Sequence, residues 1–355
     1  MLMRVLLAAA VTLFALPATA QFYSGKTLTL LVNYGVGGNA DTEARIYQRY
    51  LPKYIAGNPT VIIRNAPGAG GATAINQLGL GIASQPDGLT AGYFTTSATT
   101  SLTEDPVLKV KLFDFIPIVA AGGFNVVYAR RDIAPGGMTK PADIAKARNV
   151  YAGGYARGTS HDTRLRLALE IMGLPYTMVT GFPGNAQMNK AMLQNEINFT
   201  GSSLPGYHTQ VIPQIINTGV GMTLFQFPAI GADGAPIGDP ALVRDGIPTF
   251  DKFYAQAFGK PPSGPKFNAL LLMNDISTKL QRLVLLPKGS PAEAAEALRA
   301  AFNALGHDKD FVEDYMKVTG EEPDLIPAEM VDPLFQRMRH IDPEVVRILK
   351  ESVAE

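Results

Sequence analysis

The sequence has no cysteine and little charge. With no cysteine among its 355 residues, disulfide bonds, thiolate metal sites and cysteine nucleophiles are all excluded. Only 17% of the residues are charged, and 31 lysines and arginines balance 31 aspartates and glutamates. This balance argues against nucleic acid or an anionic membrane surface as a partner, because both bind basic patches. Histidine is also scarce, and the spacing of the histidines predicts no metal site: they are His161, His208, His307 and His340.

Long apolar runs are absent beyond the first twenty residues. Residues 5–16 form an apolar stretch behind Arg4, but a membrane-spanning helix needs about 20 such residues. The small-x-small pattern Ala18-Thr19-Ala20 follows, so we expect residues 1–20 to be a signal peptide cleaved after Ala20. Without a twin-arginine pair the chain should be exported unfolded, and we therefore predict no preloaded cofactor.

The rest of the chain alternates β-rich segments, glycine-rich turns and helical segments. This alternation predicts parallel α/β sheets whose loops gather at the carboxyl ends of the strands. We expect two lobes, residues 21–122 plus 226–355 and an inserted lobe of residues 123–225, with a hinge and a cleft between them. Residues 231–268 are rich in glycine and proline, and we expect them to form a long surface excursion. The expected strands are 26–33, 60–63, 89–94, 115–121, 125–129, 150–151, 178–180, 197–200, 220–225 and 279–286.

Two glycine-rich turns follow the first two expected strands. Residues 35–40 match G-x-G-x-x-A, a dinucleotide-binding pattern, but Arg64 and Asn65 stand where such a site needs an acidic residue. A structural turn without a ligand and an anion site for a smaller ligand are the alternatives. The second turn, residues 67–71, favours the anion site, because two helix N-termini at one sheet edge suit a carboxylate.

Residues for nucleophilic catalysis are poorly arranged, so we do not expect an enzyme. Ser160 and His161 are sequence neighbours at a helix start, where capping explains them better than a catalytic pair. Residues 201–206 do not match G-x-S-x-G. Arg157 lies in a glycine-containing loop and is either an exposed loop residue or a bidentate clamp for a carboxylate. Phe182 is either a core residue or part of a cleft wall.

Several short motifs occur in a characteristic order. Residues 65–71 match N-x-P-G-A-G-G without departure, and residues 33–41 match P-F-x-P-G-G-x-x-D loosely. Further pieces are Pro86-Asp87-Gly88, Tyr151 ten residues before His161, Ile247-Pro248-Thr249 and the run from Leu286 to Pro291. In this order the motifs resemble those of the solute-binding receptors of tripartite tricarboxylate transporters, the Bug family. The resemblance covers nearly the whole chain after the expected signal peptide.

This resemblance implies a two-lobed α/β fold of the type II periplasmic-binding-protein class. It implies a periplasmic protein that closes on a small carboxylate ligand and delivers it to membrane permease subunits. We expect a monomer. A sensor that presents its ligand to a membrane kinase would use the same fold, and a secreted dinucleotide-dependent oxidoreductase is a further alternative.

The expected ligand-binding residues come from loops of both lobes. Phe182 stands where the family usually has tyrosine, and Ser202 where an aspartate is common. The loss of this aspartate and the presence of Arg157 favour a ligand with a second negative group, while Tyr155, Phe182 and Phe124 leave an aromatic acid as an option. The residues are Tyr34, Gly35, Val36, Gly37, Gly38, Asn39, Ala40, Asp41, Pro67, Gly68, Ala69, Gly70, Gly71, Thr95, Thr96, Ser97, Arg157, Gly158, Thr159, Ser160, His161, Phe182, Gly184, Asn185 and Ser202.

Overall fold

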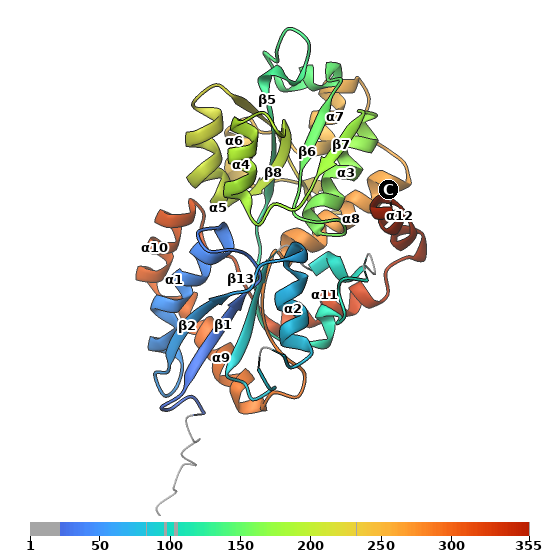
Figure 1. The fold of residues 1–355 in the computed structure, drawn as a ribbon. Helices are drawn as coiled ribbons and strands as arrows, with labels where there is room; N and C mark the ends of the chain where they lie inside the picture. The colour runs from blue at the N-terminus through green and yellow to red at the C-terminus, as the bar shows by residue number, and fades with distance from the viewer. Residues whose placement is uncertain (1–21, 83, 96–97, 103–105, 232, 355) are drawn as a thin grey trace, which may run out of the picture.

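The chain folds into two α/β lobes stacked one above the other (Figure 1). The structure is a computed structural model that describes residues 22–82, 84–95, 98–102, 106–231 and 233–354. The expected signal peptide, and Thr96 and Ser97 of the expected site, lie outside these residues. Within them, no helix is both long and apolar enough to cross a membrane.

The first lobe contains a six-stranded sheet of order β13-β4-β12-β3-β1-β2. Strand β1 pairs in parallel with β2 and β3, but the pairs that involve β12 and β13 are antiparallel. The expected parallel pairing is therefore confirmed for β1, β2 and β3 and does not extend to β4, β12 and β13. The strands are β1 (Thr27–Val32), β2 (Thr60–Asn65), β3 (Thr90–Thr95), β4 (Ile116–Ala121), β12 (Arg282–Leu286) and β13 (Leu325–Pro327).

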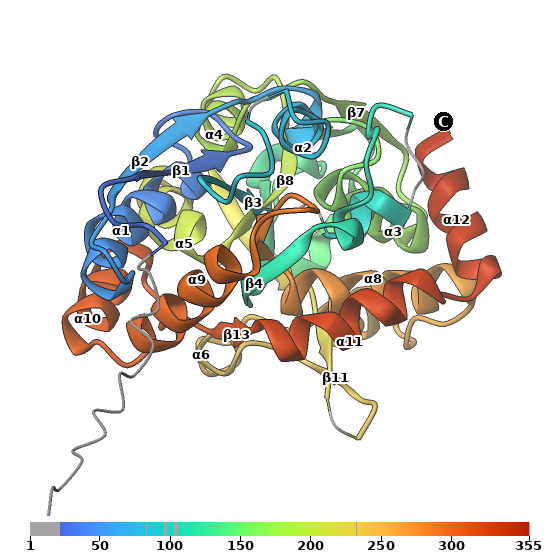
Figure 2. The same cartoon turned by 90° about the horizontal axis from the view of Figure 1, so that it is seen from below.

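Helices cover both faces of this sheet. Seen from below, α1, α9 and α10 lie together along one edge of the lobe (Figure 2). The helical elements are α1 (Asn39–Tyr54), η1 (Ala69–Gly71), α2 (Ala72–Gly79), η2 (Ala98–Leu102), η3 (Leu112–Asp114), α9 (Ala292–Leu305), α10 (Lys309–Thr319) and α11 (Ala328–Arg339). Pro52 lies inside α1 near its last turn, and the helix continues to Tyr54.

The second lobe contains a five-stranded sheet of order β7-β6-β8-β5-β9. Strand β6 pairs in parallel with β7 and β8, and β5 pairs antiparallel with β8 and β9. The strands are β5 (Asn125–Arg130), β6 (Val150–Gly153), β7 (Tyr176–Val179), β8 (Phe199–Ser203) and β9 (Gly221–Gln226). The helical elements are η4 (Arg131–Ile133), η5 (Pro141–Lys146), α3 (Ser160–Met172), α4 (Asn185–Leu193), α5 (Leu204–Gly206) and η6 (Tyr207–Ile216).

Residues 231–268 are a surface excursion only in part: most residues from 233 to 247 are exposed or half-buried, but the stretch also forms regular elements and buries some side chains. They complete a small hairpin and form two helices and the start of a third. The aromatic residues Phe250 and Phe253 are buried, with ring centroids 5.0 and 4.9 Å from that of Phe225. The elements are β10 (Ala229–Ile230), β11 (Pro236–Ile237), α6 (Pro240–Arg244), α7 (Phe250–Phe258) and α8 (Pro265–Lys279). Because α7 contacts η5 and β9, this stretch packs against the second lobe.

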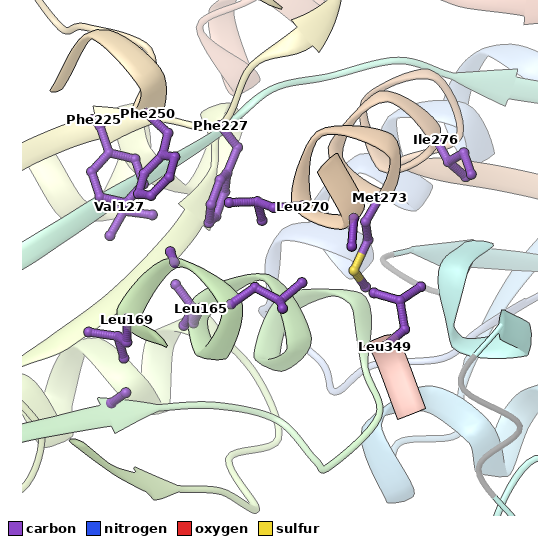
Figure 3. Close-up of a cluster of buried hydrophobic side chains, with 14 of the residues drawn as sticks. Val127, Leu165, Leu169, Phe225, Phe227, Phe250, Leu270, Met273, Ile276 and Leu349 are labelled. Atoms are coloured by element: carbon purple, nitrogen blue, oxygen red, sulfur yellow. The ribbon is translucent and has the colours of Figure 1, made fainter. Parts of the chain in front are cut away.

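The lobes are joined by the β4–β5 connection and by α8. The Gly122 and Gly123 amides donate to the carbonyls of Asp324 and Thr278. Because Thr278 belongs to α8, the second of these bonds holds the β4–β5 connection against that helix. The last helix, α12 (Pro343–Ala354), packs on α8, α3 and η2. Figure 3 shows the apolar cluster at this junction, where Leu165, Leu270, Met273 and Leu349 come together. The hydrophobic core is therefore continuous along the side of the molecule where the lobes are joined.

Candidate functional site

Two neighbouring cavities lie between the lobes, and residues of both lobes line each of them. The first, here called the inner cavity, lies next to the hinge formed by the β4–β5 connection and the end of α8, and has a volume of about 40 Å³. This volume holds roughly three water molecules, at about 10–15 Å³ for each. The second, here called the outer cavity, has a volume of about 430 Å³. The small inner volume shows that the lobes stand close together in this structure.

The expected site residues are divided between these cavities. Those that line the inner cavity are Tyr34, Gly38, Asn39, Ala40, Thr95, His161, Gly184 and Asn185. Those that line the outer cavity are Tyr34, Pro67, Gly68, Ala69, Gly70, Gly71, Arg157 and Phe182. Those that line neither are Gly35, Val36, Gly37, Asp41, Gly158, Thr159, Ser160 and Ser202.

The first glycine loop places the start of α1 at the inner cavity. Gly38 is the N-cap residue of the helix, and the Gly37 amide donates to Asp41 Oδ2 over 2.9 Å. Arg45 donates to both carboxylate oxygens of Asp41. Burial raises the pKa of Asp41, but these hydrogen bonds outweigh it and hold that pKa below its usual value. Asp41 therefore fixes the loop, while Val36 at its tip is exposed.

The second glycine loop places the start of α2 at the outer cavity. Gly68 and Gly71 have φ angles of 129° and 95°, which residues with a side chain rarely adopt. A Cβ on Gly71 would also collide with the side-chain amide of Asn33. Asn33 joins β1 to β3, because its amide exchanges hydrogen bonds with the backbone of Thr95. The loop thus lies directly against the end of the central strands.

The helix start of α3 carries a buried polar cluster. The Thr159 hydroxyl accepts from the Asp162 amide and donates to its carboxylate, so Thr159 is the N-cap. Burial raises the pKa of Asp162 to about 7. Burial and then the charge of Arg164 lower the pKa of His161 to about 3, so its imidazole is neutral. His161 Nε2 lies 3.4 Å from the Gly153 carbonyl oxygen and 3.5 Å from Thr200 Oγ1.

The start of α4 and the end of β8 complete the second-lobe wall. Asn185 donates to the Gly201 carbonyl over 3.0 Å and accepts from the Tyr155 hydroxyl over 2.5 Å. Neighbouring residues in a strand face opposite sides of the sheet. Accordingly Ser203, not Ser202, lines the inner cavity. The sequence pattern identified the right strand end but the wrong face.

Asn39 reaches across the cleft. Its side-chain amide donates to Ser203 Oγ over 3.2 Å, and Gln210 Nε2 donates to Asn39 Oδ1 over 3.1 Å. Asn39 belongs to α1 of the first lobe, whereas Ser203 and Gln210 belong to the second. We call these three residues the cross-lobe latch. Their hydrogen bonds hold the start of α1 against the second lobe.

A buried ion pair beside the hinge was not predicted from the sequence. Arg282 donates to both carboxylate oxygens of Glu43, to the Gly122 carbonyl and to Glu321. Glu43 also accepts from the Tyr93 hydroxyl over 2.7 Å. Glu43 and Arg282 are 239 positions apart, so no local pattern could pair them. Other residues that line the inner cavity and that the sequence did not indicate are Asn125, Ser203 and Gln281. Tyr155, which was expected only as a contact for an aromatic acid, lines it as well.

The chemistry of the inner cavity suits an anion. Residues from the first turns of α1, α3 and α4 line it, so helix N-termini from both lobes meet there. Each N-terminus carries about half a positive charge and amides without helical partners. In the described part of the chain, the charged residues that line the inner cavity are Glu43 and Arg282, and their charges neutralise each other. Within that part of the chain, no group of three or more histidine and carboxylate side chains could hold a metal ion.

The two lobes form an α/β fold of the type found in periplasmic binding proteins. No protein-family model and no curated protein sequence matches the chain. Among solved structures, it is similar to the periplasmic binding protein BugD, with 18% identity, coverage of 93% of this chain and 98% of that one, and a TM-score of 0.70.

Two further solved structures were obtained with acids bound. MatC (Rpa3494) from Rhodopseudomonas palustris, with bound malate, is 17% identical, with coverage of 92% and 99% and a TM-score of 0.65. Rpa4515 of R. palustris, with adipate, is 18% identical, with coverage of 93% and 97% and a TM-score of 0.66. At these identities the similarity shows the fold, and the fold predicted from the sequence motifs is thereby confirmed.

Proposed function

We propose that this protein is a solute-binding receptor that captures a small organic carboxylate between its lobes. The observation that carries the proposal is the meeting of helix N-termini from both lobes at a cavity whose charged residues are already paired. Such a site attracts an anion without an unpaired arginine or lysine. The malate and adipate bound by two proteins of the same fold support a carboxylate as the ligand class.

The same proposal covers cellular role and location. The Bug-type motifs and the fold support a receptor that delivers its ligand to a membrane permease of the tripartite tricarboxylate type. The pattern of residues 1–20 supports export to the periplasm through a cleaved signal peptide. In this role the chain performs no catalysis, acts as a monomer, and is built as a discontinuous first domain with an inserted second domain.

A thermal-shift screen tests the binding function. The panel contains dicarboxylic, tricarboxylic and aromatic acids, with nucleotides included. A ligand present at about 100 times its Kd stabilises the folded state by about 2.7 kcal/mol, which we expect to raise Tm by roughly 4 °C. A shift with one class of acid supports the proposal. If no acid raises Tm but a nucleotide does, residues 35–40 would instead be identified as a cofactor site.

A pair of variants ties the binding to the inner cavity. Ala40 is buried in the first turn of α1 and lines this cavity, so Ala40→Leu fills space that the ligand needs. Ala241 is exposed on α6, and Ala241→Leu is the matched control. We expect isothermal titration calorimetry to show lost binding for the first variant and wild-type binding for the second. Equal affinities for both would place the ligand elsewhere.

Uptake by intact cells tests the transport role. A strain that lacks this protein should lose uptake of the carboxylate identified in the screen and keep its uptake of unrelated solutes. Normal uptake with a lost transcriptional response to the same carboxylate would instead favour presentation of the ligand to a membrane kinase.

A further inference from the structure

Two tyrosines separate the inner cavity from the outer cavity. Tyr34 follows β1 in the first lobe, and Tyr155 lies between β6 and α3 in the second. Their ring centroids are 5.1 Å apart, with the rings tilted by 55°. Both residues line both cavities. The paired rings, which we call the tyrosine partition, are thus a wall shared by the two cavities, with one half supplied by each lobe.

Both rings are fixed in place. The Tyr34 hydroxyl donates to the Gly70 carbonyl over 3.2 Å, and the Tyr34 carbonyl accepts from Asn65 over 2.9 Å. The Tyr155 hydroxyl donates to Asn185, and its ring packs on His161 with centroids 4.8 Å apart. The two tyrosines are only 7% and 8% exposed. Neither ring can leave the partition without losing the hydrogen bond of its hydroxyl group.

The two cavities offer an acid different partners. The inner cavity has the helix starts of α1, α3 and α4 and a volume of about 40 Å³. The outer cavity is about ten times larger, at about 430 Å³, and has the backbone of residues 67–71 before α2. A short acid with its carboxylate at the start of α1 can stay on the inner side. A longer chain in the same place runs into the tyrosine rings.

We infer that the tyrosine partition, and Tyr155 in particular, sets an upper limit on the length of the ligand. This inference rests on the proposed carboxylate-binding function. With the partition in place, the receptor selects short dicarboxylates that fit on the inner side when the lobes part slightly to admit them. Without the Tyr155 ring, the two cavities join, and a longer dicarboxylate can place its second carboxylate at the start of α2.

Tyr155 is a better test position than Tyr34. Tyr34 also joins the two glycine loops of the first lobe, through its hydroxyl and its carbonyl. Removing the Tyr155 ring leaves Asn185 without one donor but keeps the hydrogen bond from Asn185 to Gly201. Tyr155→Phe keeps the ring and removes only the hydroxyl. Tyr151→Ala is the control for loss of a tyrosine, because Tyr151 is 44% exposed on β6 and lines neither cavity.

The experiment is calorimetric titration of the purified protein with unbranched dicarboxylates from four carbons (succinate) to eight (suberate). Thermal unfolding first establishes that each variant is folded. For the wild type, Tyr155→Phe and Tyr151→Ala, we expect affinity to fall about 100-fold or more between the four-carbon and six-carbon acids, since each of the two added methylenes costs about tenfold. For Tyr155→Ala, we expect the two affinities to be similar. If this variant does not fold, Tyr155→Leu, which keeps an apolar side chain but shortens it, should reduce the same ratio.

Several outcomes would overturn the inference. If the wild type binds the six-carbon acid as tightly as the four-carbon acid, the length limit is refuted but the proposed receptor function is not. A folded Tyr155→Ala or Tyr155→Leu variant with the wild-type ratio removes the role of Tyr155 in the same way. If the wild type binds neither this series nor any other carboxylate, the proposed function fails and the length limit fails with it.

Discussion

Closure of the lobes can be tested at Gly206, which lies beneath the cross-lobe latch. A Cβ at this position would collide with the side-chain amide of Asn39 from the other lobe. It would also meet Ser202 Oγ, a hydroxyl that can rotate away. Gly206 itself has ordinary helical angles, φ −69° and ψ −34°, so alanine strains no backbone. Gly206→Ala should therefore obstruct closure without unfolding the second lobe.

The size of the effect follows from the two hydrogen bonds of Asn39. The bonds with Ser203 and Gln210 are the ones that the collision disrupts. A hydrogen bond contributes about 0.5–1.5 kcal/mol net, so the loss is about 1–3 kcal/mol. Because the ligand is expected to bind the closed form, this loss weakens binding by roughly 5- to 150-fold. The fall in unfolding temperature should be small, because alanine also restricts the unfolded chain and so offsets about 0.4–1 kcal/mol of this loss.

The assay is calorimetric titration with the carboxylate that the wild type binds, with small-angle X-ray scattering to follow closure. Gly306→Ala is the matched control, because Gly306 also has helical angles and its nearest neighbour, Leu325 Cδ1, would lie at an ordinary 3.5 Å. Asn39→Ala completes a double-mutant cycle. In that background Gly206→Ala should have no further effect on affinity. A full additional loss there, or no loss in the wild-type background, would refute the reasoning.

Three further predictions concern the buried titratable groups. Burial raises the pKa of Glu321 from 4.5 to about 8, so the stability it contributes is complete below about pH 4.5 and is lost as the pH rises through 8. Glu321→Gln should flatten the fall in Tm between pH 5 and 9, leaving the slope that Asp162 contributes. Arg282→Met leaves the Glu43 carboxylate buried without its cation and should lower the free energy of unfolding, measured in urea, by about 3–5 kcal/mol. Adding Glu43→Leu to the same chain should restore most of this free energy. The His161 ring, with a pKa of about 3, should stay neutral from pH 5 to 8 in an NMR titration.

Each of these predictions has a clear contrary result. Identical pH slopes for the wild type and Glu321→Gln would mean that Glu321 is ionised in the folded state at neutral pH. A double variant no more stable than Arg282→Met would show that packing, not the unpaired charge, causes the loss. A His161 ring that titrates near its ordinary value of 6.5 would show that water reaches the inner cavity freely.

The sequence predicted the two-lobed α/β fold well, because strand and helix patterns are local. The strands from Thr27 to Thr95 were expected within a few residues of their bounds. The pattern failed at α8, where no helix was expected, whereas the strand expected over 279–286 is present as β12 from Arg282. Helix α8 packs against both lobes and buries polar residues such as Asn274. Its sequence therefore lacks the single apolar face by which an amphipathic helix is recognised. At α7 the buried pair Phe250 and Phe253 has helical spacing, but its glycine- and proline-rich surroundings hid it.

The candidate site was predictable only in part, for a different physical reason. The glycine loops were identified because backbone turns need particular residues at particular positions. Which loops share a cavity depends on how closely the lobes approach, and that is a property of distant contacts. Tyr155 faces Tyr34 across 121 positions of sequence (155 minus 34), and Arg282 faces Glu43 across 239. Whether the expected residues bind a ligand stays a prediction until the titrations above are made.

The strand order of the first sheet has a consequence for how the chain folds. Strand β12 lies between β3 and β4, and it is made only after the whole second lobe. Until residues 282–286 arrive, β3 and β4 have no partner that joins them, and the first sheet remains in two pieces. Domains fold as units during synthesis, so the second lobe can be complete while the first still waits for its central strand. The lobe that begins the chain is thus expected to be the last to fold, and its long-range pairing to set the folding rate.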